Sequence, residues 1–339
     1  MMKKFFTMIL VFVAALALVG CGEKEFKVDG EFSAFELSVH QGGPMVTSVT
    51  VTVQKGKIVK YFIDARQGTV TKNSEGKITG VAWNAKTKKE LGNEYGMKGV
   101  GPEFKFEDGA WTQVEGGTSK KEWFEQANAI EAFWLANGHD AVTTVKDAKG
   151  DARINNVAGV TLKDGGYTKL AAAAVANAKA GKVIAFEHSL QGADPAKTTA
   201  QFTWVELVIE KGKIKSIFLD VRQSKVAADG SGLVWNAKTK KELGNEYGMK
   251  GVGPEFKFED GAWSMVDGGT SKNEWFEQAN AIEAFVLANG VDAVTTVKDA
   301  KGDARISNIA GVTLKDGGYI SVIKAAMKAA GLDKTASKK

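Results

Sequence analysis

Apolar and polar residues alternate along several short stretches of the chain. In the first stretch, Val49, Val51 and Val53 are separated by threonines. The same alternation returns at two further sets of positions: Tyr61, Ile63 and Ala65, and Ile217, Leu219 and Val221. A period of two residues is typical of antiparallel strands that bury one face. We therefore expect grouped strands, with turns at Gly56 and Gly212.

A helical pattern follows each group of strands. Ser119 and Glu122 have the spacing of a capping box, which closes the first turn of a helix. Four apolar residues then fall on one helical face: Trp123, Ala127, Ile130 and Trp134. Gly138 ends this expected helix, and an alanine-rich helix is expected over about 167–179. Because the strands are grouped and the helices follow separately, the pattern predicts an α+β fold.

The chain contains the same unit twice. Residues 83–111 recur without change at 235–263, and the match continues with few differences beyond them. The alanine-rich helix has its twin at about 320–330. This period is too long for solenoid repeats, which run over roughly 20–50 residues. We therefore expect two tandem copies of a small antiparallel-sheet-plus-helices domain, at 31–178 and 179–333, followed by a polar tail at 334–339.

Composition narrows the kinds of chemistry that the chain can carry. Its 339 residues are 44% hydrophobic and 25% charged, as in ordinary globular proteins. The net charge of +5 is too even for a dedicated nucleic-acid binder, so no nucleic acid is expected as a partner. There is one cysteine and there are three histidines. These counts exclude disulfides within the chain, Cys-ligated iron–sulfur clusters, c-type haem and Cys-rich zinc sites.

The N-terminus has the features of an export signal. Two lysines precede an apolar run over 5–19, which predicts a signal peptide at 1–20. The residues Leu18-Val19-Gly20-Cys21 resemble a bacterial lipobox, in which the cysteine is acylated and becomes the first residue. This resemblance implies a lipidated Cys21, a tether over 21–30, membrane lipid as a partner, and a protein held on the extracellular face of the cell membrane. An ordinary signal peptide with a chance cysteine is the alternative.

No set of side chains predicts a catalytic centre or a metal site. His40, His139 and His188 have no histidine at the matching position of the other copy, and Val291 stands opposite His139. The chain has no G-x-S-x-G nucleophile motif and no phosphate-binding P-loop. We therefore expect any chemistry to come from a bound cofactor.

One segment, present in both copies, is a candidate cofactor site. It reads Asn155-Asn-Val-Ala-Gly-Val-Thr-Leu162 in the first copy and Ser307-Asn-Ile-Ala-Gly-Val-Thr-Leu314 in the second. It resembles the S-G-A-T signature of FMN-binding (FMN-bind) domains, in which a flavin transferase attaches FMN to the threonine hydroxyl through a phosphoester. Segments 89–98 and 122–126 are similar to the flanking segments of FMN-bind lipoproteins from Gram-positive bacteria. The resemblance implies one FMN on Thr161 and one on Thr313.

The resemblance and the need for an apolar wall around a flavin ring define the expected cofactor-binding residues. In the first copy they are Tyr95, Met97, Trp123, Asn156, Ala158, Gly159, Val160, Thr161 and Leu162. In the second copy they are Tyr247, Met249, Trp275, Asn308, Ala310, Gly311, Val312, Thr313 and Leu314. Trp83 and Trp235 are further candidates for the wall, and Lys163 and Lys315 for the phosphate. Core packing is the alternative for the aromatic residues and Met, and exposure to water for the lysines. A helix that follows the threonine would favour the phosphate charge.

The segment departs from the family signature at several positions. Alanines 158 and 310 replace the serine, and valines 160 and 312 replace the alanine. Each replacement can weaken recognition by the transferase or leave FMN bound without a covalent bond. A turn that merely enters a helix is the alternative for the whole segment.

Taken with the lipobox, the resemblance implies a membrane-anchored extracellular electron carrier. Its electrons would come from a membrane NADH dehydrogenase and quinone and pass to external acceptors such as ferric iron. It would be a redox carrier rather than a classical enzyme, with ferric or flavin reductase activity left open. The alternative is a non-redox surface lipoprotein with two ligand-binding or adhesive modules.

Overall fold

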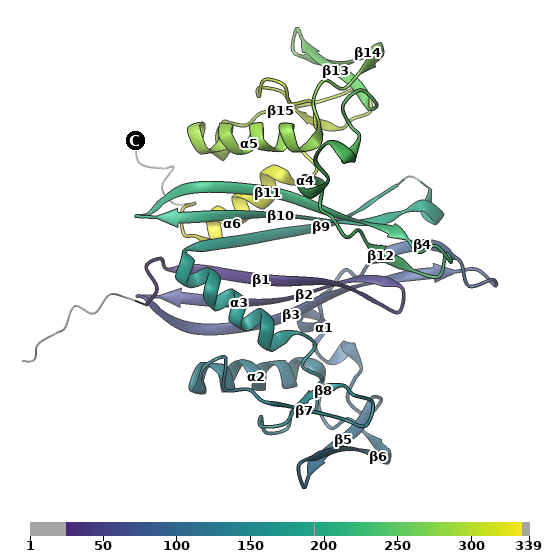
Figure 1. Ribbon diagram of the computed structural model, residues 1–339, viewed down its shortest axis with the longest axis vertical. Helices are drawn as coiled ribbons and strands as arrows, with labels where there is room; N and C mark the ends of the chain where they lie inside the picture. Colours follow the sequence, from purple (N-terminus) through teal and green to yellow (C-terminus); the bar gives the residue numbers. More distant parts are fainter. Residues whose placement is uncertain (1–24, 193, 334–339) are drawn as a thin grey trace, which may run out of the picture.

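A computed structural model describes residues 25–192 and 194–333 (Figure 1). The expected signal peptide, Cys21 and the tail at 334–339 lie outside the described residues. The chain folds into two similar α+β halves, each with a four-stranded antiparallel sheet, two small hairpins and three α-helices. No helix within 25–192 and 194–333 is long and apolar enough to cross a membrane.

The first half contains the elements up to α3. Its sheet has the order β1-β2-β3-β4, from β1 (Gly30–His40), β2 (Gly43–Gln54), β3 (Lys57–Lys72) and β4 (Ile78–Trp83). The hairpins are β5 (Pro102–Glu107) with β6 (Ala110–Thr118), and β7 (Thr144–Lys146) with β8 (Ala152–Ile154). The helices are α1 (Lys88–Leu91), η1 (Gly92–Tyr95), α2 (Trp123–Asn137) and α3 (Tyr167–Ala180).

The second half repeats this order. Its sheet runs β12-β11-β10-β9, from β9 (Lys182–Gln191), β10 (Thr199–Glu210), β11 (Lys213–Val226) and β12 (Leu233–Trp235). The hairpins are β13 (Pro254–Glu259) with β14 (Ala262–Thr270), and β15 (Thr296–Lys298) with β16 (Ala304–Ile306). The helices are η2 (Pro195–Lys197), α4 (Lys240–Leu243), η3 (Gly244–Tyr247), α5 (Trp275–Asn289), η4 (Val291–Ala293) and α6 (Tyr319–Ala329).

The alternating residues form strands as expected. In β2, Val49, Val51 and Val53 are almost fully buried, and Val49 lies opposite Ile63 of β3 in the antiparallel register. Helix α3 packs on β1 and β2, while α2 packs on β3. The two helices therefore cover one face of the sheet, and α5 and α6 take the matching places on β11 and on β9 and β10 (Figure 1).

Helix α2 begins later than the capping-box spacing indicates. The residue before its first turn is Glu122, whose backbone N–H donates to the Glu125 carboxylate at 2.7 Å. Ser119 directly follows strand β6, and its hydroxyl donates to the Lys121 carbonyl at 2.8 Å. Gly138 ends the helix with a φ of 96°, as expected.

The two halves share one interface rather than standing apart. Strands β1 and β9 lie side by side (Figure 1). Phe35 of β1 lies 4.6 Å from Phe202 and 5.6 Å from Trp204, measured between ring centroids. The indole of Trp83 donates to the Ser189 carbonyl at 3.1 Å, and the indole of Trp235 donates to the Ser38 carbonyl at 2.8 Å. Each half therefore sends a tryptophan across to the first strand of the other half.

The fold extends into the segment that the sequence assigns to a tether. Phe26 is buried in the hydrophobic core, and Asp29 accepts hydrogen bonds from the backbone N–H groups of Lys55 and Gly56. Residues 25–29 are therefore part of the first half. At the junction of the halves, α3 ends at Ala180 and β9 begins at Lys182, so Gly181 alone connects them.

Candidate functional site

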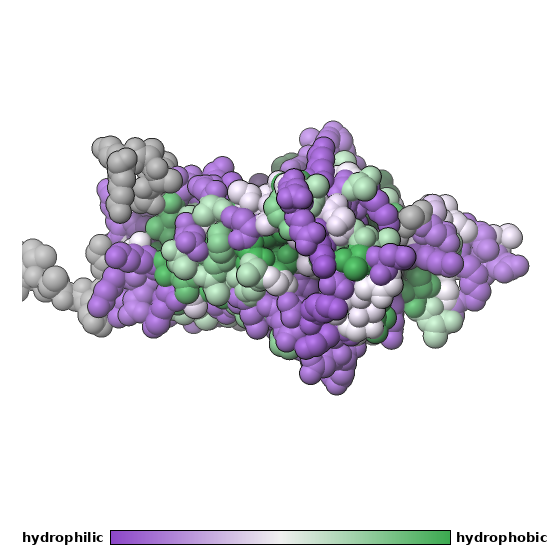
Figure 2. All heavy atoms as spheres, turned by 90° about the horizontal axis from the view of Figure 1, so that it is seen from above, coloured by the Kyte–Doolittle hydropathy of each residue, from purple (hydrophilic) through white to green (hydrophobic). Residues whose placement is uncertain are grey.

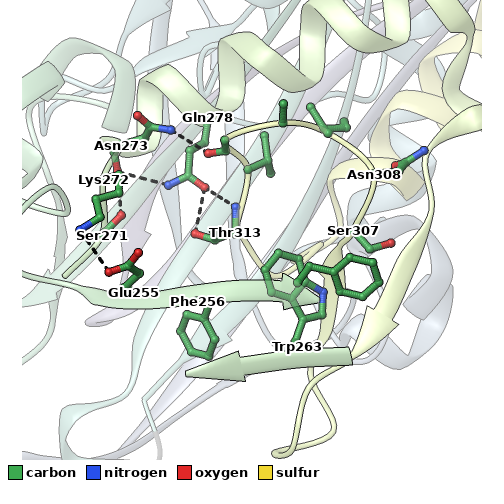
Figure 3. Close-up of a pocket in the computed structure, with 15 residues that line it drawn as sticks. Glu255, Phe256, Trp263, Ser271, Lys272, Asn273, Gln278, Ser307, Asn308 and Thr313 are labelled. Atoms are coloured by element: carbon green, nitrogen blue, oxygen red, sulfur yellow. Dashed lines mark hydrogen bonds and ion pairs between the residues drawn. The ribbon is translucent and has the colours of Figure 1, made fainter. Parts of the chain in front are cut away.

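The threonine of each A-G-V-T segment is held by a buried glutamine. Thr161 lies in the loop between β8 and α3, and Gln126 lies in the first turn of α2 with 1% of its surface exposed. The side-chain oxygen of Gln126 accepts from the backbone N–H of Thr161 at 2.8 Å and from its hydroxyl at 3.3 Å. In the second half, Gln278 makes the same bonds to Thr313 at 2.8 and 3.4 Å (Figure 3).

A buried arginine fixes the other side of the same loop. The Arg153 guanidinium donates to the Thr161 carbonyl at 2.7 Å and to the Asp147 carboxylate at 2.7 Å, and it lies 3.4 Å from the ring centroid of Phe104. Burial alone would raise the pKa of Asp147, but the Arg153 bond and two backbone N–H groups lower it below its usual value. Arg305, Asp299 and Phe256 repeat this arrangement at Thr313.

In the second half, the threonine opens onto a pocket of about 470 Å³. One wall is aromatic and comes from the β13–β14 hairpin: Phe256, Phe258 and Trp263. The opposite wall is residues 271–273 with Gln278, and the floor is the loop 307–313 (Figure 3). This volume lies in the range of small-molecule sites, about 300–1,000 Å³.

The matching pocket in the first half measures about 140 Å³. Its lining residues come from the same elements: Glu103, Phe104, Ser119, Lys120, Lys121, Gln126, Gly159 and Thr161. The main chemical difference between the two linings is at one position, where Lys121 stands in the first half and Asn273 in the second.

The aromatic wall of the second pocket contains a buried donor without a partner in the described part of the chain. The indole N–H groups of Trp263 and of its counterpart Trp111 are buried and have no hydrogen-bond partner among the described residues. Buried donors are rarely left unpaired, and the indole N–H of Trp134 in the core of the first half is a third example among the described residues. The sequence pattern did not single out Trp111 and Trp263, although they are the last residues of the identical segments 83–111 and 235–263.

The structure brings part of the expected set together at the pocket. Ala158 and Gly159 are exposed beside Thr161, and Gly159 has a φ of 72°, which favours glycine. Val160 and Leu162 instead turn into the hydrophobic core. Their counterparts are placed in the same way: Ala310, Gly311, Val312, Thr313 and Leu314.

The asparagine of the segment supports the loop, and in the second half Asn308 also lines the pocket. Asn156 donates to the Ala141 carbonyl at 2.8 Å and accepts from the Thr143 N–H at 2.9 Å. Asn308 makes the matching bonds to Ala293 and Thr295, at 2.7 and 3.0 Å. Both asparagines therefore fix the loop that precedes the small β7–β8 or β15–β16 hairpin.

The expected aromatic wall lies behind the glutamine and does not line the pocket. Trp123 is 2% exposed and donates to the Tyr167 hydroxyl at 3.1 Å, while Tyr95 packs beside it at 6.4 Å between centroids. Met97 reaches the site only through its sulfur, 3.9 Å from the side-chain nitrogen of Gln126. Tyr247, Met249 and Trp275 repeat this cluster. Core packing therefore describes these residues.

The remaining candidates have structural partners elsewhere. Trp83 and Trp235 lie in the interface between the halves. Lys163 pairs with Asp151 at 2.6 Å, as does Lys315 with Asp303. Asp164 accepts the Thr168 N–H at the start of α3, whereas Thr161 is hydrogen-bonded to Gln126 of the preceding helix, α2. Within the described residues, no group of three His, Cys, Asp or Glu side chains could hold a metal ion.

Comparisons with known proteins add little. No protein-family model matches the chain, and no curated protein matches it. A solution NMR structure of a structural-genomics target from Clostridium thermocellum is 24% identical to it, over 44% of this chain and 91% of that chain, with a TM-score of 0.25.

Proposed function

We propose that each half carries one FMN, linked through its phosphate to Thr161 or Thr313, and that the protein is a lipid-anchored electron carrier on the extracellular face of the cell membrane. The observation that carries this proposal is the geometry of the threonine, whose half-buried hydroxyl faces a pocket in both halves and is fixed by a buried amide. A hydroxyl is the group that a phosphoester requires. FMN, when bound, takes up and releases one or two electrons.

The residues that line the second pocket fit such a group. The hairpin aromatics Phe256, Phe258 and Trp263 supply an apolar wall, and the Thr313 hydroxyl, Lys272 and Asn273 supply polar groups at the pocket. The second pocket, at about 470 Å³, is large enough to hold a substantial part of a flavin. The proposed donor is a membrane NADH dehydrogenase with quinone, the proposed acceptors include ferric iron, and a flavin transferase attaches the cofactor.

The test is to express the exported protein with a flavin transferase and to denature it before measurement. We expect yellow fluorescence that stays with the denatured band and a mass increase of two FMN groups less water. Thr161→Ala and Thr313→Ala should each remove one group, and the double variant should remove both. Thr143→Ala and Thr295→Ala are matched controls, because their hydroxyls bond to residues 155 and 307 and lie outside the pockets.

The other outcomes separate the alternatives. Flavin that binds the native protein but leaves on denaturation contradicts the phosphoester. Protein that binds no flavin, with or without the transferase, contradicts the redox proposal and favours the non-redox alternative, a surface protein with two ligand-binding modules.

A further inference from the structure

The two threonine pockets are nearly identical in sequence but differ in charge. Lys121 of the first half is replaced by Asn273 in the second. Both residues directly precede the glutamate that begins a long helix, so they occupy the same place in the fold. The difference gives a comparison of two sites within one molecule.

The side chain of Lys121 lies directly over the glycine of the loop. A methyl group built on Gly159 would clash with the Lys121 ammonium nitrogen. The half-buried ammonium therefore lies against the backbone two residues before Thr161, in the small first pocket. In the second half, the Asn273 amide donates to the Gly311 carbonyl at 2.8 Å, so a neutral group replaces the cation.

The other charges around the pockets cancel within each half. The lysine next to the differing position pairs with a carboxylate at 3.1 Å in both, Lys120 with Glu103 and Lys272 with Glu255. Each loop arginine pairs with its aspartate at 2.7 Å. No ion pair is formed by Lys121 among the described residues. The first site therefore carries one uncompensated positive charge that the second site lacks.

We propose that Lys121 makes the Thr161 site the stronger of the two sites for the phosphate of a phosphate monoester. A lysine ammonium is a common phosphate ligand, and a charged donor makes a stronger hydrogen bond than a neutral one. Because the ammonium lies in a small, half-buried pocket, solvent screens its attraction for an anion less than on an open surface. The stronger binding of phosphate at Thr161 does not depend on the proposed function. The further expectation that Thr161 is loaded with flavin before Thr313 rests on the proposed function.

The first arm of the test uses the full mature chain without flavin and inorganic phosphate as the probe. Amide NMR shifts of Gly159 and Thr161 should titrate at a phosphate concentration about three- to tenfold lower than those of Gly311 and Thr313. Lys121→Asn should abolish this difference. Asn273→Lys should bring the second site to the affinity of the first, and added salt should weaken the stronger site more.

The second arm follows flavin loading site by site. Trypsin cuts after Arg153 and Lys163 and after Arg305 and Lys315, and the two resulting peptides differ in sequence. Mass spectrometry can therefore measure each threonine separately during a time course with limiting flavin donor. We expect Thr161 to load first in the wild type and the order to disappear in Lys121→Asn. Lys120→Asn removes an equal charge that is already paired, and should change the order less.

Equal phosphate titration at both sites, or a site difference that Lys121→Asn leaves unchanged, would overturn this inference. If no flavin is attached but the phosphate difference is present and follows Lys121, the inference about the site stands and the flavin proposal fails. Circular dichroism of each variant verifies that the fold is intact.

Discussion

At the scale of single residues, the site depends on one buried amide in each half. Gln278 accepts two hydrogen bonds from Thr313 and donates to the Asn273 carbonyl at 3.2 Å. It thereby joins the loop of the threonine to the segment that opens helix α5. A buried polar side chain is tolerated because its hydrogen bonds are satisfied. The side chain of Gln278 therefore both orients the Thr313 hydroxyl and stabilises the loop 307–313.

Replacing this amide should destabilise the protein. In Gln278→Leu the backbone N–H of Thr313 loses its partner, which we expect to lower the free energy of unfolding by about 1–3 kcal/mol. Urea denaturation measures this change. Gln113→Met is the matched control, because the second half already has the exposed Met265 at that position, and it should change stability little. Equal stability of the wild type and Gln278→Leu would contradict the role of the amide.

At the scale of elements, local pattern predicted the regular parts of the fold. The alternating valines of β2 and the alanine-rich α3 were found from sequence because each element buries one face. The start of α2 was placed too early because Ser119 satisfies the same spacing rule as Glu122. What decides between them is a contact distant in sequence, since the Glu122 carboxylate also accepts from the backbone N–H groups of Met97 and Lys98, at 2.9 and 3.1 Å.

Two substitutions distinguish these assignments of the helix start. Glu122→Ala removes the acceptor of two backbone N–H groups outside the helix and should lower the free energy of unfolding by about 1–3 kcal/mol. Ser119→Ala removes one hydrogen bond to a carbonyl that also accepts from Gln126, and should have the smaller effect. Thermal or urea unfolding measures both variants. A larger effect for Ser119→Ala would favour the capping box indicated by the sequence.

The candidate site could be predicted only in part, because it too depends on contacts between residues distant in sequence. The threonine and glycine are marked by the repeated segment, but pocket walls are built by residues from other elements. The hairpin aromatics Phe256 and Trp263 meet the loop only after β13 and β14 fold toward it. Trp123 and Trp275, which open α2 and α5, have the flat apolar side chain that stacking on a flavin requires. Both are buried in the core instead. Side-chain direction depends on tertiary packing, which one sequence does not specify.

At the scale of the whole molecule, duplication has produced two halves that pack on each other. Apolar and hydrophilic side chains alternate in patches over the end formed by the second half (Figure 2), whereas the contact between the halves concentrates aromatic rings. Phe35, Phe186 and Phe202 meet there with centroid separations of 4.6–5.7 Å. The two proposed cofactor sites therefore lie on two halves that pack against each other, rather than on two domains without contact.

This interface contains a histidine that should make its stability depend on pH. His188 of β9 packs against Trp83 of the other half, at 4.8 Å between ring centroids. Burial, with a smaller contribution from the positive charge of Arg66, lowers the pKa of His188 from 6.5 to about 4. Between pH 6.5 and pH 4 the unfolded chain therefore binds this proton and the folded chain does not. Stability due to His188 should be fully present above pH 6.5 and should fall as the pH drops toward 4.

Urea midpoints at pH 7, 5 and 4 measure this dependence. His188→Leu is the natural matched variant, because the first half has Leu37 in the position equivalent to His188, with Ser38 and Ser189 next in each strand. The variant should lose less stability than the wild type between pH 7 and pH 4. His188→Gln is polar but does not titrate in this range, so it separates loss of the proton site from a change in packing, and it should also show the weaker pH dependence. Parallel curves for wild type and both variants would show that protonation of His188 does not act on the contact between the halves.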